Sequence, residues 1–316
     1  MPRHLLDIRD LSTQELDDLM DRADDIIQNP KRYAECMHGK KLATLFYEPS
    51  TRTRLSFEAA MLELGGSVLG FSSADSSSAS KGESVADTVR TVGCYADVIA
   101  MRHPKEGAPT AAAQVSPVPI INAGDGGHNH PTQTLADLLT IRREKGRLNQ
   151  LVIGCCGDLQ FGRTVHSLIN AMMRYKSIRF VLISPEELRV PEYVRESMHK
   201  NGVSFVEVER LEDVIGTLDI LYMTRVQRER FTDLMEYERV KNVYILRNKM
   251  LEHTRPNLRI LHPLPRVNEI AYDVDDNPKA YYFQQAQNGL YAREAILCDV
   301  LGITLDEVKK SKGVIQ

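Results

Sequence analysis

The residue types best suited to chemistry stand together directly after an apolar run of the chain. The run Leu42–Tyr47 predicts a buried parallel strand, and a helical pattern follows it. Three hydroxyls and two guanidiniums mark the point where the helix begins, and they belong to Ser50, Thr51, Arg52, Thr53 and Arg54. A helix N-terminus offers free backbone N–H groups and the positive end of the helix dipole. The stretch therefore predicts an anion site, with phosphate as the favoured anion; the alternative is that Ser50 merely caps the helix and the arginines are solvated.

A second candidate anion contact ends a serine-rich segment. Ser72–Ser84 has no apolar periodicity and is typical of a flexible loop. Lys81 and Gly82 stand near its end, just before the helical pattern Val85–Tyr95. The sequence leaves two interpretations open for this segment, a second contact to the anion and an ordinary linker.

Two histidines follow a glycine cluster that predicts a turn. His130 comes just before an expected helix that has Pro131 at its first position and ends at Gly146. His128 and His130 together raise the question of a metal. No carboxylate or cysteine accompanies them at ligand spacing, so we expect no metal here.

Polar residues also follow the strand candidates of the second half of the chain. They are Arg163, the segment Thr224–Gln227 and the segment His262–Arg266. Arginines at strand ends are poorly explained as core residues, whereas a site for an anionic substrate explains them. Gly154, Gly157 and Gly162 suggest a dinucleotide site, but their spacing is not G-x-G-x-x-G and no acidic residue ends the next strand. Nucleotide binding is therefore not expected.

The elements that must position these residues alternate between short apolar runs and helical patterns, which predicts an α/β fold of two doubly wound parallel sheets. The strand candidates of the first domain are Leu42–Tyr47, Val68–Phe71, Val98–Met101 and Val118–Ile121. Those of the second are Leu151–Cys156, Ile178–Ile183, Val203–Val208, Ile220–Met223, Val243–Leu246 and Leu258–Leu261. Residues 12–28 predict a helix capped by Ser12 with Glu15, and Leu55, Ala59 and Leu62 are expected on one face of the helix after Thr53.

Interdomain helices are expected to join the two domains. The expected bounds are 1–131 plus 288–316 for the first domain, 132–149 for a linking helix and 150–287 for the second. The last helix, near Leu290–Leu301, is apolar along its length and is expected to pack back on the first domain.

Length and composition bound the class of protein. The 316 residues suffice for two domains, and 42% apolar with 26% charged residues is ordinary for a globular protein. A net charge of −3 argues against a nucleic-acid-binding surface, and no apolar run approaches the roughly 20 residues that span a bilayer. We expect a cytoplasmic enzyme, because no apolar signal segment follows Met1.

The cysteines predict neither a disulfide framework nor a zinc site. There are five, an odd number without C-x-x-C spacing. Cys155 and Cys156 lie in an apolar run, so we expect buried reduced thiols. A nucleophilic cysteine is the alternative.

Taken together, six motifs resemble the aspartate/ornithine carbamoyltransferase family over nearly the whole chain. They are Ser50–Arg54, Lys81–Glu83, Met101–Pro104, His130–Gln133, Gly157–His166 and His262–Arg266. Thr224–Gln227 and the His262–Arg266 segment resemble the aspartate branch, since the ornithine branch would show H-C-L-P where Leu264 stands. The other interpretations are an ornithine or related carbamoyltransferase and a non-catalytic homologue that has kept the fold.

The resemblance implies that carbamoyl phosphate and L-aspartate give N-carbamoyl-L-aspartate and phosphate, a step of pyrimidine synthesis, without metal or organic cofactor. It implies carbamoyl phosphate binding by Ser50, Thr51, Arg52, Thr53, Ser77, Arg102, His130 and Gln133. It implies aspartate binding by Lys81, Arg163, Arg225, Gln227, Pro263 and Leu264. The catalytic residues would be Arg52, Thr53, Lys81, Arg102, His130 and Gln133. Ser77 is assigned by counting back from Lys81, and Ser78 is the alternative.

The resemblance also implies an assembly. In the family the loop that carries Lys81 reaches into the active site of a neighbouring subunit, which implies a homotrimer with active sites shared between chains. The sequence leaves open whether regulatory chains or a dihydroorotase accompany the catalytic chains. No nucleic acid and no membrane are expected as partners.

Overall fold

The computed structural model describes residues 2–228, 231, 233–304 and 308, and the chain divides into two compact units. One unit is Met1–Leu139 with Gln287–Gln316, and the other is Thr140–Ala286. Helices α6 (Pro131–Lys145) and α10 (Tyr282–Val300) each begin in one unit and end in the other. The domain bounds expected from the sequence, with a separate linking helix over 132–149, remain a proposal. Their residues 305–307 and 309–316 lie outside the described residues.

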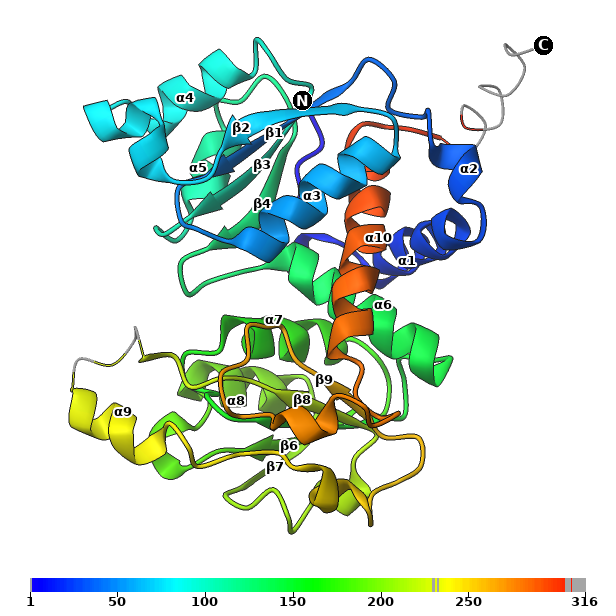
Figure 1. Ribbon diagram of the computed structural model, residues 1–316, viewed down its shortest axis with the longest axis vertical. Helices are drawn as coiled ribbons and strands as arrows, with labels where there is room; N and C mark the ends of the chain where they lie inside the picture. Colours follow the sequence, from blue (N-terminus) through cyan, green and yellow to red (C-terminus); the bar gives the residue numbers. More distant parts are fainter. Residues whose placement is uncertain (1, 229–230, 232, 305–307, 309–316) are drawn as a thin grey trace. The chain divides into compact units, whose positions relative to one another are not determined.

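A four-stranded parallel sheet forms the centre of the first unit (Figure 1). Its strands are β1 (Lys41–Phe46), β2 (Ser67–Phe71), β3 (Val98–His103) and β4 (Ile120–Asp125). Its helices are α1 (Thr13–Gln28), α2 (Pro30–Tyr33), α3 (Thr51–Glu63), α4 (Val85–Val92), α5 (Ala108–Ala113) and the 3-10 turns η1 (Ile8–Asp10), η2 (Ala74–Ser76) and η3 (Ser78–Lys81). The strand order β2-β1-β3-β4 reverses between β1 and β3, the point at which ligands bind in doubly wound sheets.

Helices cover both faces of this sheet, and the alternating side chains of β1 contact a helix on each face. On one face, the Thr44 hydroxyl donates to Glu58 Oε1 of α3 at 3.0 Å. On the other, Ala43 and Leu45 belong to a core cluster that includes Val89 of α4 and Ala112 of α5. With both faces covered, the strands read as continuous apolar runs.

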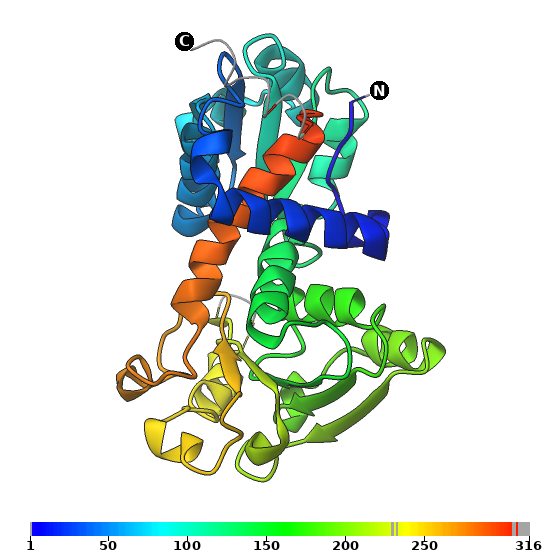
Figure 2. The same cartoon turned by 90° about the vertical axis from the view of Figure 1, so that its right-hand side faces the viewer.

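Two further helices complete the first unit. Helix α1 begins with the predicted capping box, since Ser12 Oγ accepts from the Glu15 N–H at 3.1 Å and Glu15 Oε2 accepts from the Ser12 N–H at 2.7 Å. The later part of α10 lies beside α1 (Figure 2). Polar contacts accompany this packing: Arg22 Nη1 donates to the Ile303 carbonyl at 3.0 Å.

The second unit is built on a five-stranded parallel sheet. Its strands are β5 (Val152–Cys156), β6 (Arg179–Ile183), β7 (Ser204–Val208), β8 (Ile220–Met223) and β9 (Arg259–Leu261), in the order β7-β6-β5-β8-β9. Its remaining helices are α7 (Arg163–Met172), α8 (Glu192–Lys200), α9 (Leu234–Val240) and the 3-10 turns η4 (Glu186–Leu188), η5 (Ile215–Thr217), η7 (Asn248–Leu251) and η8 (Tyr272–Val274). Here the order reverses between β5 and β8. The prediction of two doubly wound parallel α/β domains is therefore confirmed.

One local prediction is wrong, and another is only partly right. Val243–Leu246 is not a strand, since only Leu246 forms an isolated bridge, with Ile270. The face of α3 that carries Leu55 and Leu62 is exposed, at 57% and 56%, while Phe57, Ala60 and Met61 are buried. The glycine cluster after Ile121 is only partly a turn, because β4 continues to Asp125 and the turn covers 126–128.

No helix among the described residues is long and apolar enough to cross a membrane.

Candidate active site

The anion-binding stretch predicted from the sequence begins α3 at the carboxyl edge of the first sheet. Ser50 is the N-cap residue with extended backbone, but its hydroxyl makes no capping hydrogen bond. Thr51 and Arg52 are exposed and Thr53 is buried. The first N–H groups of a helix have no partner within it, so this end combines free donors, hydroxyls and a guanidinium. The alternative that Ser50 only caps the helix is disfavoured, because its hydroxyl makes no capping hydrogen bond.

The arginine at the end of β3 is held beside that helix. Arg102 pairs in register with Phe46, the last residue of β1, and is 8% exposed. Its Nη2 lies 2.7 Å from Glu48 Oε1, and its Nη1 donates to the Ala123 carbonyl at 3.4 Å. Its Nε has no hydrogen-bond partner among the described residues. The sequence reasoning missed Glu48, although it stands two residues before Ser50 in the same motif.

A glycine lets a second donor approach Arg102. Gly124 has φ +116°, and a Cβ built on it would lie 2.9 Å from Arg102 Nη1 and 3.4 Å from His130 Cδ2. The guanidinium and the imidazole thus converge on the same small space at the end of β4. Only glycine tolerates both this backbone conformation and this approach.

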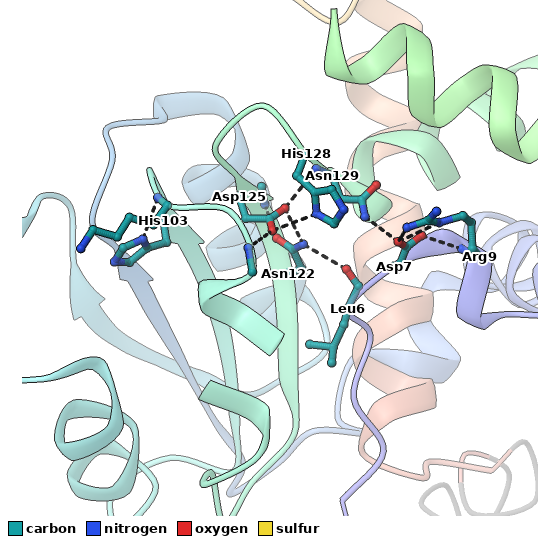
Figure 3. A network of polar contacts seen from close by, with 11 residues as sticks. Leu6, Asp7, Arg9, His103, Asn122, Asp125, His128 and Asn129 are labelled. Atoms are coloured by element: carbon teal, nitrogen blue, oxygen red, sulfur yellow. Dashed lines mark hydrogen bonds and ion pairs between the residues drawn. The ribbon is translucent and has the colours of Figure 1, made fainter. Parts of the chain in front are cut away.

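A buried carboxylate organises the turn that leads to His130 (Figure 3). Asp125 is 1% exposed, and its Oδ1 accepts from Asn122 Nδ2 and from the Asn129 N–H, both at 3.0 Å. Its Oδ2 accepts from the Gly107 N–H at 2.8 Å and lies 3.2 Å from His128 Nδ1. An anion accepting several N–H bonds fixes a turn firmly. His128 therefore helps to hold this turn through Asp125. The role of Asp125 was not predicted from the sequence.

Helix α6 continues the site from His130. His130 is 5% exposed, and its carbonyl accepts from the N–H groups of Gln133 and Thr134 at 3.0 and 3.1 Å. Gln133 is half-buried, and its Nε2 donates to Asp137 Oδ1 at 2.8 Å. The structure thus brings Arg102, His130 and Gln133 to the same edge as the N-terminus of α3.

The serine-rich segment, which is typical of a flexible loop by sequence, holds the two 3-10 turns η2 and η3. The Ser77 hydroxyl donates to the Ala74 carbonyl at 2.8 Å, and Lys81 is exposed at the end of η3. The Lys81 ammonium group makes no hydrogen bond or ion pair with any residue that the structure describes. No hydrogen bond or ion pair among the described residues joins the Lys81 ammonium group to Arg102 or His130.

In the second unit, a buried aspartate ties the ends of β5 and β8 together. Asp158 follows β5 and is fully buried; its Oδ1 accepts from the Phe161 N–H at 2.9 Å and its Oδ2 from the Gln227 N–H at 3.3 Å. Gln227 Nε2 donates to the Phe161 carbonyl at 3.0 Å. Burial raises the pKa of Asp158, although these N–H groups and the charge of Arg225 act against the rise. Asp158 thereby fixes the two segments that carry the predicted residues.

The arginines of this unit lie at the same carboxyl edge. Arg163 is the first residue of α7, and Arg225 follows β8; both side chains are half-buried. The structure therefore brings Arg163, Arg225 and Gln227 together at the switch point of the second sheet, where the sequence predicted an anionic substrate.

The segment after β9 is shaped by a buried histidine. His262 Nδ1 accepts from the Leu264 N–H and its Nε2 lies beside Glu269 Oε1, both at 2.7 Å. Leu264 has φ +55°, and the Leu264–Pro265 peptide is cis. Burial disfavours the charged form of Glu269, but His262 and backbone donors outweigh it and hold the pKa of Glu269 below its usual value. Pro263 and Leu264 are half-buried in this turn.

The two thiols at the end of β5 are ordinary residues of the core. Cys155 and Cys156 are buried, and burial raises the pKa of Cys155 to about 12. Such thiols stay protonated and are poor nucleophiles. In the described part of the chain, no group of three or more histidine, cysteine, aspartate and glutamate side chains is arranged to hold a metal ion.

The fold and these two sites correspond to a known class of transferase. Residues 3–143 match the carbamoyl-phosphate-binding domain of aspartate/ornithine carbamoyltransferases, and residues 149–300 match their aspartate/ornithine-binding domain. The chain belongs to the aspartate/ornithine carbamoyltransferase family.

Within the family, the chain is similar to the catalytic subunits of aspartate carbamoyltransferases. It is 62% identical over 306 residues to the aspartate carbamoyltransferase catalytic subunit of Lachnoclostridium phytofermentans, covering 96% of this chain and 100% of that protein. It is 59% identical over 302 residues to the subunit of the same name from Clostridium botulinum, covering 95% and 98%.

Solved structures of this kind have the same fold. The catalytic subunit of M. jannaschii aspartate transcarbamoylase matches with a TM-score of 0.88 at 46% identity, over 95% of this chain and 99% of that one. Aspartate transcarbamoylase from Trypanosoma cruzi in complex with N-(phosphonacetyl)-L-aspartic acid matches with a TM-score of 0.88 at 36% identity, over 94% and 95%.

Proposed function

We propose that this chain is an aspartate carbamoyltransferase, which transfers the carbamoyl group of carbamoyl phosphate to the amine of L-aspartate. The products are N-carbamoyl-L-aspartate and phosphate, a step of pyrimidine synthesis. The observation that carries the proposal is the convergence of Arg102 and His130 on Gly124, at the edge where the α3 N-terminus leaves the Ser50 hydroxyl unused by its own helix.

The first unit supplies groups for an activated acyl phosphate. Ser50, Thr51, Arg52 and Thr53 bind the phosphate at the helix end, and Ser77 adds a further hydroxyl. Thr53, Arg102 and His130 donate to the carbamoyl oxygen, while Gln133 contacts the carbamoyl NH₂ group.

The chemistry follows from these positions. The aspartate amine attacks the carbamoyl carbon, and the carbonyl oxygen gains negative charge in the tetrahedral intermediate. Donors already aimed at that oxygen lower the barrier, by about 3 kcal/mol for a single donor in comparable sites. The C–O bond to phosphate then breaks, Arg52 stabilises the charge that the phosphate gains, and the phosphate accepts the proton of the amine. Carbamoyl phosphate is already activated, so this reaction needs neither metal nor organic cofactor.

The second unit supplies groups for a dicarboxylate. Arg163 and Arg225 suit the two carboxylates of aspartate, because a guanidinium binds a carboxylate bidentately. Gln227 and Lys81 add donors, and the backbone carbonyls of Pro263 and Leu264 accept from the amino group. The aspartate branch is favoured over ornithine because both arginines would repel a basic substrate side chain.

We also propose a cytoplasmic homotrimer in which Lys81 serves the active site of a neighbouring chain. Its exposed ammonium group supports this, because no described residue of its own chain engages it. The exposed Leu55 and Leu62 give α3 an apolar strip available for a partner chain. Regulatory chains could then be added to such trimers in a larger assembly.

An inhibitor that carries both substrates' charges tests the proposed function. A molecule with a phosphonate and two carboxylates should bind far more tightly than carbamoyl phosphate or aspartate alone, because it gains the contacts of both. In calorimetric titrations, this molecule should compete with carbamoyl phosphate for binding to the protein. Binding no tighter than that of either substrate would contradict the proposal.

A further inference from the structure

One buried arginine lies behind the candidate carbamoyl site. Arg293 of α10 is 4% exposed; its Nη1 donates to the Gly289 carbonyl at 2.7 Å, and its guanidinium lies 5.2 Å from the centre of the Phe57 ring. Its Nε has no hydrogen-bond partner among the described residues. Burial lowers the pKa of Arg293 to about 10, and the negative charge of Asp137 opposes this effect. Burying a charged group costs desolvation free energy, so we expect a specific role for Arg293.

Arg293 is connected to two of the candidate site residues. Its charge faces that of the fully buried Asp137, which accepts from Gln133 Nε2 at 2.8 Å. Its Nη2 donates to Thr132 Oγ1 at 3.5 Å, and that oxygen lies 3.4 Å from His130 Nδ1.

The first connection determines how Gln133 is turned. An ionised carboxylate can only accept hydrogen bonds, so Asp137 requires Gln133 to offer its NH₂ group. The Gln133 Oε1 is then left without a hydrogen bond among the described residues, available as an acceptor. The positive charge of Arg293 faces this carboxyl group and favours the form that only accepts hydrogen bonds.

The second connection favours one of the two positions for the hydrogen on the His130 ring. A guanidinium has no acceptor, so Thr132 Oγ1 must accept from Arg293 and can direct its own hydrogen to His130 Nδ1. A neutral imidazole that accepts at Nδ1 donates at Nε2.

We propose that Arg293 is a positioning residue that sets the hydrogen-bond polarity of the carbamoyl site. Through Thr132 it makes His130 a donor suited to a carbonyl oxygen, and through Asp137 it makes Gln133 an acceptor suited to an NH₂ group. This pattern matches a carbamoyl group and rejects an acetyl group, whose methyl has nothing to donate. The inference rests on the proposed function, in which Gln133 contacts the carbamoyl NH₂.

The test compares carbamoyl phosphate with acetyl phosphate, which differs by CH₃ in place of NH₂. The KM for carbamoyl phosphate and the inhibition constant of acetyl phosphate are measured in the whole enzyme, and their ratio reports discrimination. Asp137→Asn and Arg293→Met should each lower discrimination by about 5–10-fold, the equivalent of one hydrogen bond. Asp137→Asn preserves shape, so the test remains decisive if Arg293→Met does not fold.

Two further variants distinguish a failure of this inference from a failure of the proposed function. Glu294→Gln alters a buried residue next to Arg293 on the same helix and should leave discrimination unchanged. Gln133→Met should lower discrimination as much as Asp137→Asn does. If only Gln133→Met lowers it, Arg293 and Asp137 are merely structural and the inference is wrong, while the proposed function stands. If Gln133→Met has no effect, the contact from Gln133 to the NH₂ group is itself wrong.

Discussion

Glu48 Oε1 lies 2.7 Å from Arg102 Nη2, which joins the end of β1 to the end of β3 across the switch point of the first sheet. The same guanidinium is one of the two donors that converge on Gly124. Arg102 is almost fully buried, and its Nε has no hydrogen-bond partner in the described part of the chain, so the ion pair with Glu48 holds its guanidinium. This ion pair orients a group that the proposed reaction needs at the carbamoyl oxygen.

Glu48→Gln should therefore reduce turnover. The neutral amide keeps the shape of the side chain but loses the charge-assisted bond that orients Arg102, which is equivalent to about tenfold in rate. Steady-state kinetics at saturating substrates would measure it, and Glu48→Asp should recover part of the loss. Turnover equal to that of the parent in Glu48→Gln would show that Arg102 does not depend on this contact.

Arg52→Ala should lower turnover by about 10²–10³-fold without changing the melting temperature, because it removes stabilisation of the leaving phosphate. Arg54→Ala is the matched control, because Arg54 lies two residues along the same helix. Arg54 Nε already donates to Glu58 Oε1 at 2.7 Å, so its loss should affect stability more than turnover. A tenfold or smaller loss in Arg52→Ala would refute the role assigned to Arg52.

Shared active sites predict that two inactive variants restore activity when they assemble together. Arg52→Ala and Lys81→Ala are unfolded and refolded as a mixture, so that some interfaces pair an intact Arg52 with an intact Lys81. Cyclic symmetry allows about one such site per trimer. Activity should return in the mixture and in neither variant refolded alone.

The control for this experiment mixes Arg52→Ala with His130→Ala. Both residues belong to the same unit of one chain, so every site keeps a defect and no activity should return. Mixed trimers of the first pair that stay inactive would mean that each site is built from one chain.

The pair of His262 and Glu269 predicts a pH-dependent contribution to stability. The pKa of Glu269 is held below its ordinary value of 4.5, so its contribution is complete above that pH and is lost as the pH falls through the lower folded-state value. Glu269→Gln should lower the free energy of unfolding by about 2 kcal/mol at pH 7. In urea titrations the difference should shrink below pH 4.5, whereas the exposed Glu252→Gln should show little difference at any pH. A difference that persists unchanged at low pH would contradict this account.

The strands could be read from the sequence because parallel strands covered on both faces are continuous apolar runs. Val243–Leu246 fails this rule: Val243 is 44% exposed, and the segment forms only one bridge. For helix α3, the sequence did not show which face is buried. Leu55 and Leu62 form one helical stripe and Phe57 and Met61 another, and spacing alone does not say which stripe faces the sheet.

Candidate site residues could be found where a local signal marks them, as at the N-terminus of α3. Glu48 and Asp158 were missed as supports because their contacts are long-range. Glu48 meets Arg102 across 54 positions, and Asp158 meets Gln227 across 69. Such contacts follow from strand order, which the sequence pattern does not specify.

The central claim is that this chain carbamoylates aspartate, and product analysis tests it most directly. The purified protein is incubated with carbamoyl phosphate labelled at the carbamoyl carbon, together with either aspartate or ornithine, and the labelled products are identified by NMR. We expect N-carbamoyl-L-aspartate with an equal amount of phosphate, no citrulline, and about 10²–10³-fold slower formation of the aspartate product by Arg52→Ala. Citrulline formation, or no carbamoylation of aspartate by the folded parent protein, would contradict it.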